Sequence, residues 1–225
     1  MRLLYTTPVF FLLLFSCDSN IFTGKLDEGV ITYEITYMED PKENPIIGLL
    51  PTSMTVKFKD NNTIQKIEGW MSVFTMAGIA KRKEDLNAAY IKIMGKKMYY
   101  ETTLDGPSFG FDEMPGIELI ETEETKEIAG YTCKKVTVSF PESSGGTFDI
   151  YYTNDIKIDQ PNLHNPFREI DGVLMEYQMI FLSIHMILES SKVQDTEIND
   201  QVFESPRDFN EVPREEMQDC LNSLL

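Results

Sequence analysis

Short segments in which apolar and polar residues alternate recur along most of this chain. Between Val30 and Met38, for example, isoleucine and tyrosine occupy every second position and are separated by threonine and glutamate. A period of two places the apolar side chains on one face of a half-buried β-strand. The same pattern returns in segments 54–59, 136–140 and 148–152, and segments 89–94 and 97–102 flank a predicted hairpin turn. Because no long amphipathic helix separates these segments, they predict antiparallel strands that follow one another in a meander.

Turn residues lie between several of the predicted strands. Asp60-Asn61-Asn62 follows the second strand, and Met94-Gly95 and the run 143–146 (SSGG) predict two hairpins. A further β-rich pair is expected from Gly172 to Glu189. One segment, Pro213–Leu225, has the pattern of a helix, with proline in its first turn and acidic residues near its positive end. These patterns predict a mainly β domain with short helices and a C-terminal helix.

The composition excludes some classes of partner. The chain has 225 residues, of which 42% are hydrophobic and 11% aromatic, so it can bury a core. Its formal net charge is −17, which repels phosphate backbones, and the basic stripe that a nucleic-acid-binding protein needs is missing. The same charge argues against general electrostatic adhesion to anionic membranes. We therefore expect no nucleic-acid partner.

The N-terminus has the layout of a secretory signal. Arg2 precedes the apolar run Val9–Phe15, which is far too short to span a bilayer as a helix. The sequence LFSC at residues 14–17 resembles the lipobox of bacterial lipoproteins, in which the cysteine receives a diacylglyceryl group, although Phe15 is larger than usual there. An ordinary signal peptide with a chance cysteine is the alternative. The predicted divisions are a lipoprotein signal peptide (1–16), the lipidated Cys17 with its tether (17–27) and a β domain (28–225).

Lipidation would determine where the protein works. Several acyl chains on Cys17 would hold it on a membrane almost permanently, since each buried CH₂ contributes about 0.8 kcal/mol. We therefore expect a protein of the Gram-negative cell envelope, anchored to a membrane and facing the periplasm or the cell surface. The choice of membrane and leaflet stays open.

The chemistry-bearing residues predict no active site. The two histidines, His164 in a predicted loop and His185 in an apolar strand, are too few and too isolated for a zinc site. No G-x-S-x-G elbow, phosphate-binding glycine loop or calcium-loop motif is present. Cys133 and Cys220 are expected to be buried, reduced thiols rather than a disulfide. The sequence thus predicts no enzyme, no metal and no cofactor.

Six short segments resemble a family of Gram-negative envelope lipoproteins grouped with the LolA/LolB lipoprotein-carrier superfamily. They are NP (44–45), LPTSM (50–54), MGKK (94–97), IAGYTCKK (128–135), YYTND (151–155) and FESP (203–206). The likeness extends from about Gly29 to Leu221, and IAGYTCKK is its most specific part. The resemblance implies a single open, incomplete antiparallel β-barrel around an apolar concavity, with short plug or lid helices. It implies no particular activity.

Carriers of this superfamily hold acyl chains in their concavity, and two features of the chain are compatible with that use. Flexible methionines in predicted strands could line an adaptable apolar site, although methionine in a strand is more often core. The candidate lining residues are Met71, Met76, Met94, Met98, Met175, Met179 and Met186. An apolar segment between two prolines could form a lid on the barrel or a loop that touches the membrane. Its large residues are Ile46, Ile47, Leu49 and Leu50.

Two functions follow from these expectations. The first is a lipid-anchored, non-enzymatic protein that binds an apolar ligand, such as an acyl chain or the lipid of a lipoprotein, in an open barrel. The second is an accessory lipoprotein with a filled barrel that binds another envelope protein. An apolar concavity of about 300 Å³ or more would favour the first function, and a solidly packed core the second.

Overall fold

The computed structural model describes residues 25–69, 74–106, 110, 114, 116–140 and 146–223. The predicted signal peptide, Cys17 and most of the tether therefore lie outside the described residues. The strands are β1 Glu28–Tyr37, β2 Ser53–Lys59, β3 Asn62–Glu68, β4 Phe74–Lys81, β5 Leu86–Ile93, β6 Lys96–Thr102, β7 Glu118–Ile128, β8 Tyr131–Ser139, β9 Thr147–Thr153, β10 Val173–Phe181, β11 Ile184–Gln194 and β12 Asn210–Glu211. The helices are η1 Pro45–Leu49, η3 Arg82–Glu84, η4 Asp200–Phe203 and α1 Arg214–Asn222, of which the three η elements are 3₁₀-helices.

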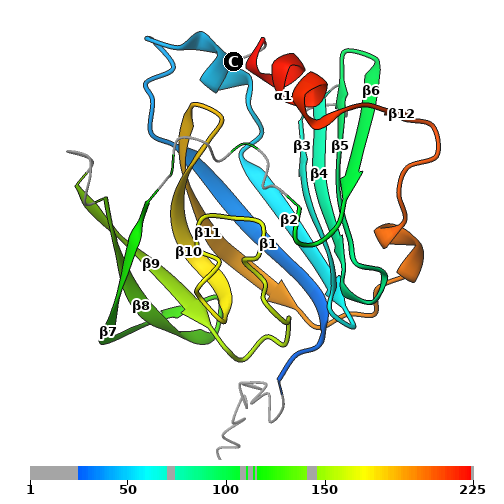
Figure 1. Cartoon of the computed structure of the whole chain (residues 1–225). Helices are drawn as coiled ribbons and strands as arrows, with labels where there is room; N and C mark the ends of the chain where they lie inside the picture. The colour runs from blue at the N-terminus through cyan, green and yellow to red at the C-terminus, as the bar shows by residue number, and fades with distance from the viewer. Residues whose placement is uncertain are drawn as a thin grey trace, which may run out of the picture.

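All twelve described strands belong to one strongly curved sheet (Figure 1). Its order is β12-β6-β5-β4-β3-β2-β1-β11-β10-β9-β8-β7, and every neighbouring pair is antiparallel except β12 and β6. Strands adjacent in sequence are adjacent in the sheet, except for β6 with β7 and β11 with β12. β1 joins the two runs of strands, because it pairs with β11 as well as β2. Among the described residues no pairing joins β7 to β12, so the sheet is open. The predicted mainly β, meandering architecture and the C-terminal helix are confirmed.

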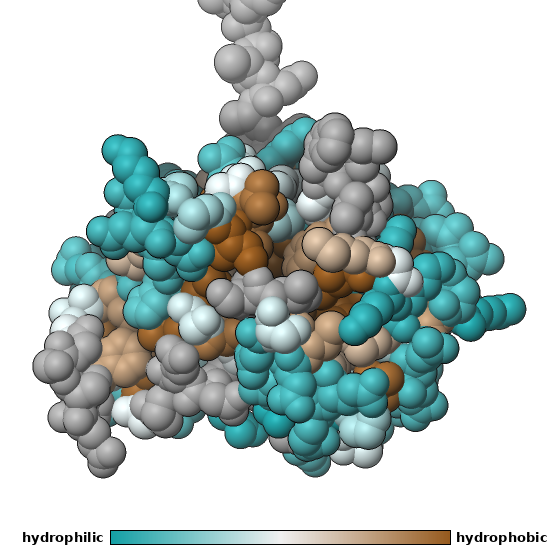
Figure 2. Space-filling view, turned by 90° about the horizontal axis from the view of Figure 1, so that it is seen from above, coloured by the Kyte–Doolittle hydropathy of each residue, from teal (hydrophilic) through white to brown (hydrophobic). Residues whose placement is uncertain are grey.

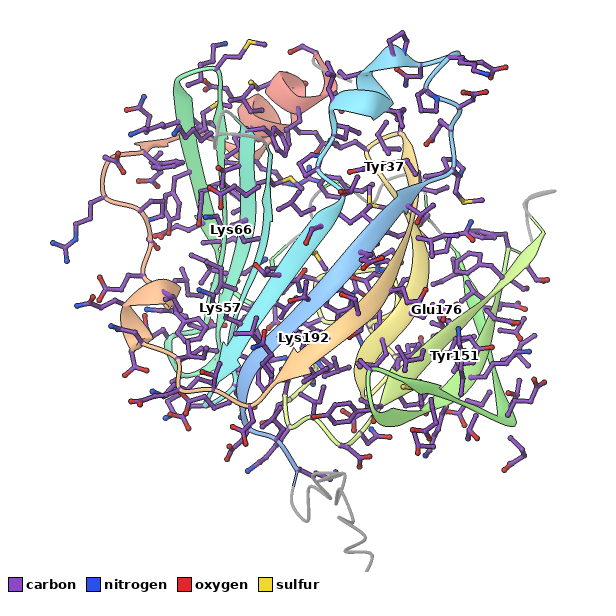
Figure 3. The ribbon with its side chains drawn as sticks, turned by 180° about the vertical axis from the view of Figure 1, so that it is seen from behind. Tyr37, Lys57, Lys66, Tyr151, Glu176 and Lys192 are labelled. Atoms are coloured by element: carbon purple, nitrogen blue, oxygen red, sulfur yellow. The ribbon has the colours of Figure 1, made fainter. Side chains whose placement is uncertain are left out.

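The two faces of the sheet differ in polarity, as the alternating sequence predicts. In β1, Ile31 and Tyr33 are buried on the concave face, while the intervening positions face the convex side. Figure 3 shows Lys57, Lys66 and Lys192 on the convex face of the neighbouring strands β2, β3 and β11. The concave face therefore carries the apolar side chains that build the core and the candidate site.

The chain itself fills one half of the concave face. The loop between β9 and β10 places Phe167, with none of its surface exposed, against β1 and β8–β11. Its ring contacts Tyr177 and Phe148 edge-on at centroid distances of 6.3 and 6.5 Å, and Tyr177 contacts Tyr33 at 5.9 Å. The Tyr33 hydroxyl donates to the Leu174 carbonyl at 2.7 Å, which satisfies this buried polar group. This half is a packed core.

Other elements support the β3–β6 half. The segment before η4 and η4 itself pack Ile198 and Phe203 against the convex side of β3–β6. On the concave side, α1 packs Met217 and Leu221 against β5 and β6. Met217 and Leu221 are the buried residues of α1. The η4 segment thus stabilises the sheet from its convex side, and α1 stabilises it on the concave side of β5 and β6. Together they leave the middle of the concave face open.

Two features of the fold were not fully predicted from the sequence. The acidic stretch 118–127, which the alternating pattern does not mark as a strand, forms the exposed strand β7 at the edge of the sheet, where its charges protect the edge from pairing. Cys133 is buried in the main core and burial raises its pKa to about 12, whereas Cys220 lies half-buried on α1. Both cysteines are free. Within the described ranges, no helix is long and apolar enough to cross a membrane.

Candidate functional site

A cavity of about 380 Å³ lies over the concave face of β3, β4 and β5. Its walls are the end of η1, the tip of the β10–β11 hairpin, Leu221 of α1 and the loop 158–165. Viewed from above, apolar residues gather in a hollow at the middle of this end of the molecule, and hydrophilic residues surround them (Figure 2). The cavity is therefore the apolar part of the concave face that the chain does not fill.

The hollow exists because β4 and β5 carry very small side chains there. Gly78, Ala80 and Ala89 line the cavity, and Gly78 pairs with Gln65 on one side and Ala89 on the other. A Cβ atom added at Gly78 would have no neighbouring atom within 4 Å. A glycine inside a strand weakens the strand and often marks a place where another molecule approaches the backbone. The structure places that open space at the centre of the cavity floor.

The upper part of the cavity, near η1, is apolar. Ile67 of β3 and Phe74 and Met76 of β4 form its floor. Met179 and Met186, which face each other across β10 and β11, form the opposite wall. Thioether side chains adapt to ligands of varied shape at little cost, so this wall is suited to an irregular apolar ligand.

The lower part is polar. Asn61, Thr63, Gln65 and Asn87 lie at the end of the cavity where β2 turns into β3. The loop 158–165 covers this end and is fixed to the sheet by two sets of hydrogen bonds. The Asn61 amide donates to the Asp159 carboxylate at 2.9 Å, and its oxygen accepts from the Asp159 backbone amide at 3.0 Å.

Arg82 provides the second set. Its guanidinium donates to the Gln160 side chain at 3.0 Å and to the carbonyls of Asp159 and Gln160 at 2.7 and 2.9 Å. Arg82 follows β4 in η3, so these bonds connect the loop to the sheet directly below the cavity floor. The polar end is consequently closed by the protein, whereas the apolar end opens beside η1.

His164 lies at this closed end as a neutral imidazole. Its pKa is lowered to about 4, mainly by burial and then by the charges of Arg82 and Arg168, which outweigh the opposing charge of Asp105. The Asn87 amide donates to His164 Nδ1 at 3.1 Å, so the single ring proton resides on Nε2. That Nε2–H group is buried and has no hydrogen-bond partner among the described residues. A buried donor without a partner is costly, but this nitrogen is enclosed by the protein, so the ring must turn before an acceptor in the cavity can satisfy it.

The proline-bracketed segment forms η1 at the open end of the cavity. The Asn44 side chain caps it by accepting from the Ile46 amide, and the Tyr37 hydroxyl donates to the Pro51 carbonyl at 2.5 Å just beyond it. The four predicted residues do not share one environment. Ile47 is buried in the core with 5% of its surface exposed. Ile46, Leu49 and Leu50 line the cavity.

Leu49 projects from this wall at the mouth. It is 82% exposed, and Met94, in the turn between β5 and β6, is exposed to the same extent and lines the same mouth. Single exposed apolar residues are ordinary on protein surfaces. Here, however, two of the few large exposed ones border one opening.

The structure divides the predicted methionine lining. Met76, Met94, Met179 and Met186 lie on the cavity wall. Met98 does not, because α1 covers β6 and buries Met98 against Met217 and Leu221. Met175 is also excluded, since a register shift between Leu174 and Glu176 places it fully inside the packed core. Met71 lies outside the described residues.

Sequence reasoning missed the residues that give the cavity its shape and its polar end. Gly78 could have been noticed as a glycine in the middle of an alternating strand. Asn87 and His164 carry no such mark, because their contact joins residues 77 positions apart. In the described part of the chain, no group of three or more His, Cys, Asp or Glu side chains could hold a metal ion.

Comparison with known proteins identifies a similar fold but no family. No protein-family model matches the chain, and no curated protein matches it. Among solved structures, PNGF-II is similar, with a TM-score of 0.53 and 14% sequence identity. The match covers 88% of this chain and 33% of PNGF-II, so the chain spans about a third of that protein's length. At this identity the similarity concerns the fold alone, and it agrees with the mainly β architecture.

Proposed function

We propose that this protein is a lipid-anchored protein of the Gram-negative cell envelope that binds an apolar ligand in an incomplete β-barrel and releases it chemically unchanged. The ligand class is an acyl chain, free or belonging to a lipoprotein. The membrane is the partner of the N-terminal lipid on Cys17, and the open sheet is the binding module.

The cavity is the observation that supports this proposal. Its volume of about 380 Å³ falls within the range of small-molecule sites, about 300–1,000 Å³. It is bounded by aliphatic and thioether side chains with few polar groups, which is typical of sites for apolar ligands. A protein that used only its outer surface would gain stability by filling this space, since a void forfeits the packing contacts of its lining.

The first experiment blocks the cavity. Gly78→Leu directs a large side chain into the open space without a clash at Cβ, while Thr55→Leu places the same side chain on the convex face of β2 as a control. The full-length protein and both variants would be extracted from membranes in detergent, and co-purifying lipids identified by mass spectrometry. We expect the protein and Thr55→Leu to retain intact lipid that Gly78→Leu loses. Equal lipid in all three, or lipid recovered as a cleaved product, would contradict the proposal.

The second experiment tests the anchor. Cys17→Ser removes the only atom that the diacylglyceryl group can use, so the variant should leave the membrane fraction or accumulate as an unprocessed precursor. Cys220→Ser is the matched control, because it changes a cysteine on α1 instead. Normal processing and membrane association of Cys17→Ser would show that the cysteine is incidental.

A further inference from the structure

The polar groups of the cavity are gathered at one end, and this distribution is informative about the ligand. Asn87 and His164 lie together at the closed end, beneath the loop 158–165, and Gln65 lies two residues further along the sheet, beside Gly78. A site for a pure hydrocarbon would gain nothing from an amide and an imidazole donor in its interior, because a buried polar group without a partner costs free energy. This inference rests on the proposed function and specifies the ligand that the cavity accepts.

The length of the cavity matches one acyl chain. Along β3 the lining extends from Asn61 to Ile67, seven residues whose six steps span about 20 Å at about 3.3 Å each. One acyl chain extends about 15 Å, half of the roughly 30 Å hydrocarbon thickness of a bilayer. The volume corresponds to about a dozen groups of the size of a water molecule, at about 30 Å³ each. The cavity therefore holds one chain lengthwise and has no room for a second.

The closed end offers hydrogen-bond donors, and its fixed charges balance one another. The Nε2–H group of His164 is an enclosed donor without a described partner, which a turn of the ring would present to the cavity, and the Gln65 amide lies beside Gly78 on the neighbouring strand. Arg82 lines the same end and Arg168 acts on His164, so two guanidinium groups are near, against the carboxylates of Asp105 and Asp159. A neutral imidazole, an amide and nearby guanidinium groups suit a carboxylate or a hydroxyl group in an otherwise acidic protein.

We propose that the ligand is a free long-chain fatty acid that enters head first. Its carboxylate lies at the closed end with Gln65 and His164, and its chain runs over Gly78 and Met76 towards Leu50. Because Arg82 and Asn61 fix the loop over this end, a head group attached to a protein or to a second chain does not fit there. The methyl end of the chain reaches the mouth, where Leu49 and Met94 cover it.

The experiment compares two ligands of equal length, radiolabelled palmitate and radiolabelled hexadecane. Each would be titrated onto the full-length protein in detergent, and the label that co-elutes with the protein measured against Gly78→Leu as the background. We expect palmitate to bind at least about 10-fold more tightly than hexadecane, which is the net effect of one hydrogen bond to a charged group. Gln65→Leu and His164→Phe should each reduce this preference several-fold and leave hexadecane binding unchanged.

The controls separate the possible results. Gln178→Leu makes the same change on the convex face of β10 and should keep the preference. Gln65 is exposed to the hollow and makes no described hydrogen bond. Gln65→Leu should therefore fold normally, even if His164→Phe fails to fold. Equal binding of the two ligands, or a preference that survives both variants, would overturn the head-first fatty acid while leaving the apolar cavity in place. If neither ligand binds above the Gly78→Leu background, the proposed function itself fails.

Discussion

The two halves of the concave face differ in packing: one half is filled by the chain, and the other half is hollow. Over β8–β11 and β1, the loop after β9 inserts Phe167 among aromatic rings and leaves no space. Over β3–β5, the strands carry Gly78, Ala80 and Ala89, and none of the described segments is inserted. Both halves follow the same alternating pattern in sequence, so the difference arises from the size of the side chains and from where one loop packs.

The comparison shows how a small domain can keep a cavity and still fold. The hollow half is supported from the convex side by Phe203 and Ile198 and at its flank by Met217 and Leu221. Apolar burial on these surfaces replaces the burial that is missing inside, at about 25 cal/mol per Å². The stability of the fold should therefore depend on the filled half and on these covers, and ligand binding on the hollow half.

The largest effect is expected from emptying the filled half. Phe167→Ala removes a fully buried ring and its contacts with Tyr177 and Phe148, which should lower the free energy of unfolding by about 3–5 kcal/mol. Met76→Ala truncates a side chain that already borders empty space and should cost less than about 1.5 kcal/mol. Urea unfolding of the full-length protein measures both. Equal decreases in the free energy of unfolding for the two variants would mean that the filled and hollow halves contribute equally to stability, which would contradict the proposed difference between them.

A smaller effect is expected at the boundary between the halves. Leu50 packs partly on the main core and partly lines the cavity, so Leu50→Asp exchanges apolar burial for a charge. Because the side chain is only half-buried, we expect a loss of about 1–2 kcal/mol together with weaker retention of ligand. Leu50→Met, which keeps the apolar contact, is the matched control and should change neither by much. A Leu50→Asp variant that keeps both its stability and its ligand would show that Leu50 contributes neither to the core nor to ligand binding.

His164 makes the hollow half sensitive to pH. Its pKa is about 4 in the folded protein against 6.5 for an unperturbed histidine, so between these values the unfolded chain binds the extra proton. Its contribution is therefore complete above about pH 6.5 and is lost as the pH falls towards 4. Since the ring is partly exposed, we expect this contribution to the free energy of unfolding to be about 1 kcal/mol, which is less than the full pKa shift implies.

Comparison with His164→Gln isolates this effect from the many carboxylates. The difference in unfolding free energy between the protein and the variant should shrink as the pH is lowered from 7 to 4. A difference that stays constant over this range would show that His164 is not held neutral by the fold.

The sequence predicts most strands of both halves but misses β4 in the hollow half and β7 at the edge, and it does not show which half is filled. The alternation at Ile31 and Tyr33 is local, and so it marks the buried face of β1 before any partner is known. Met76 and Met98 look equivalent in sequence, because only the position of α1 decides that one is covered and the other borders the cavity. Packing of Phe167 and His164 depends on a loop that crosses to distant strands, and no local pattern encodes such a contact.

The smallest effect on stability, and the sharpest test of the open end, is expected at Leu49. Its side chain is 82% exposed, so Leu49→Asp should change the free energy of unfolding by less than about 0.5 kcal/mol. Its position at the mouth beside Met94 nevertheless predicts weaker retention of a chain that projects there, because the charge removes part of its cover.

The same variant distinguishes a lid from a membrane-contacting loop. Figure 1 places η1 at the end of the sheet opposite the start of β1, so the mouth faces away from the tether side of the domain. A lid then predicts that Leu49→Asp reduces co-purifying lipid, and that adding Leu49→Asp to the unanchored Cys17→Ser protein leaves its association with membranes unchanged. The control is Met38→Asp, another exposed apolar residue, which does not line the cavity. Loss of membrane association with unchanged lipid retention would instead make η1 a membrane contact, and the open end of the hollow half would then face a bilayer.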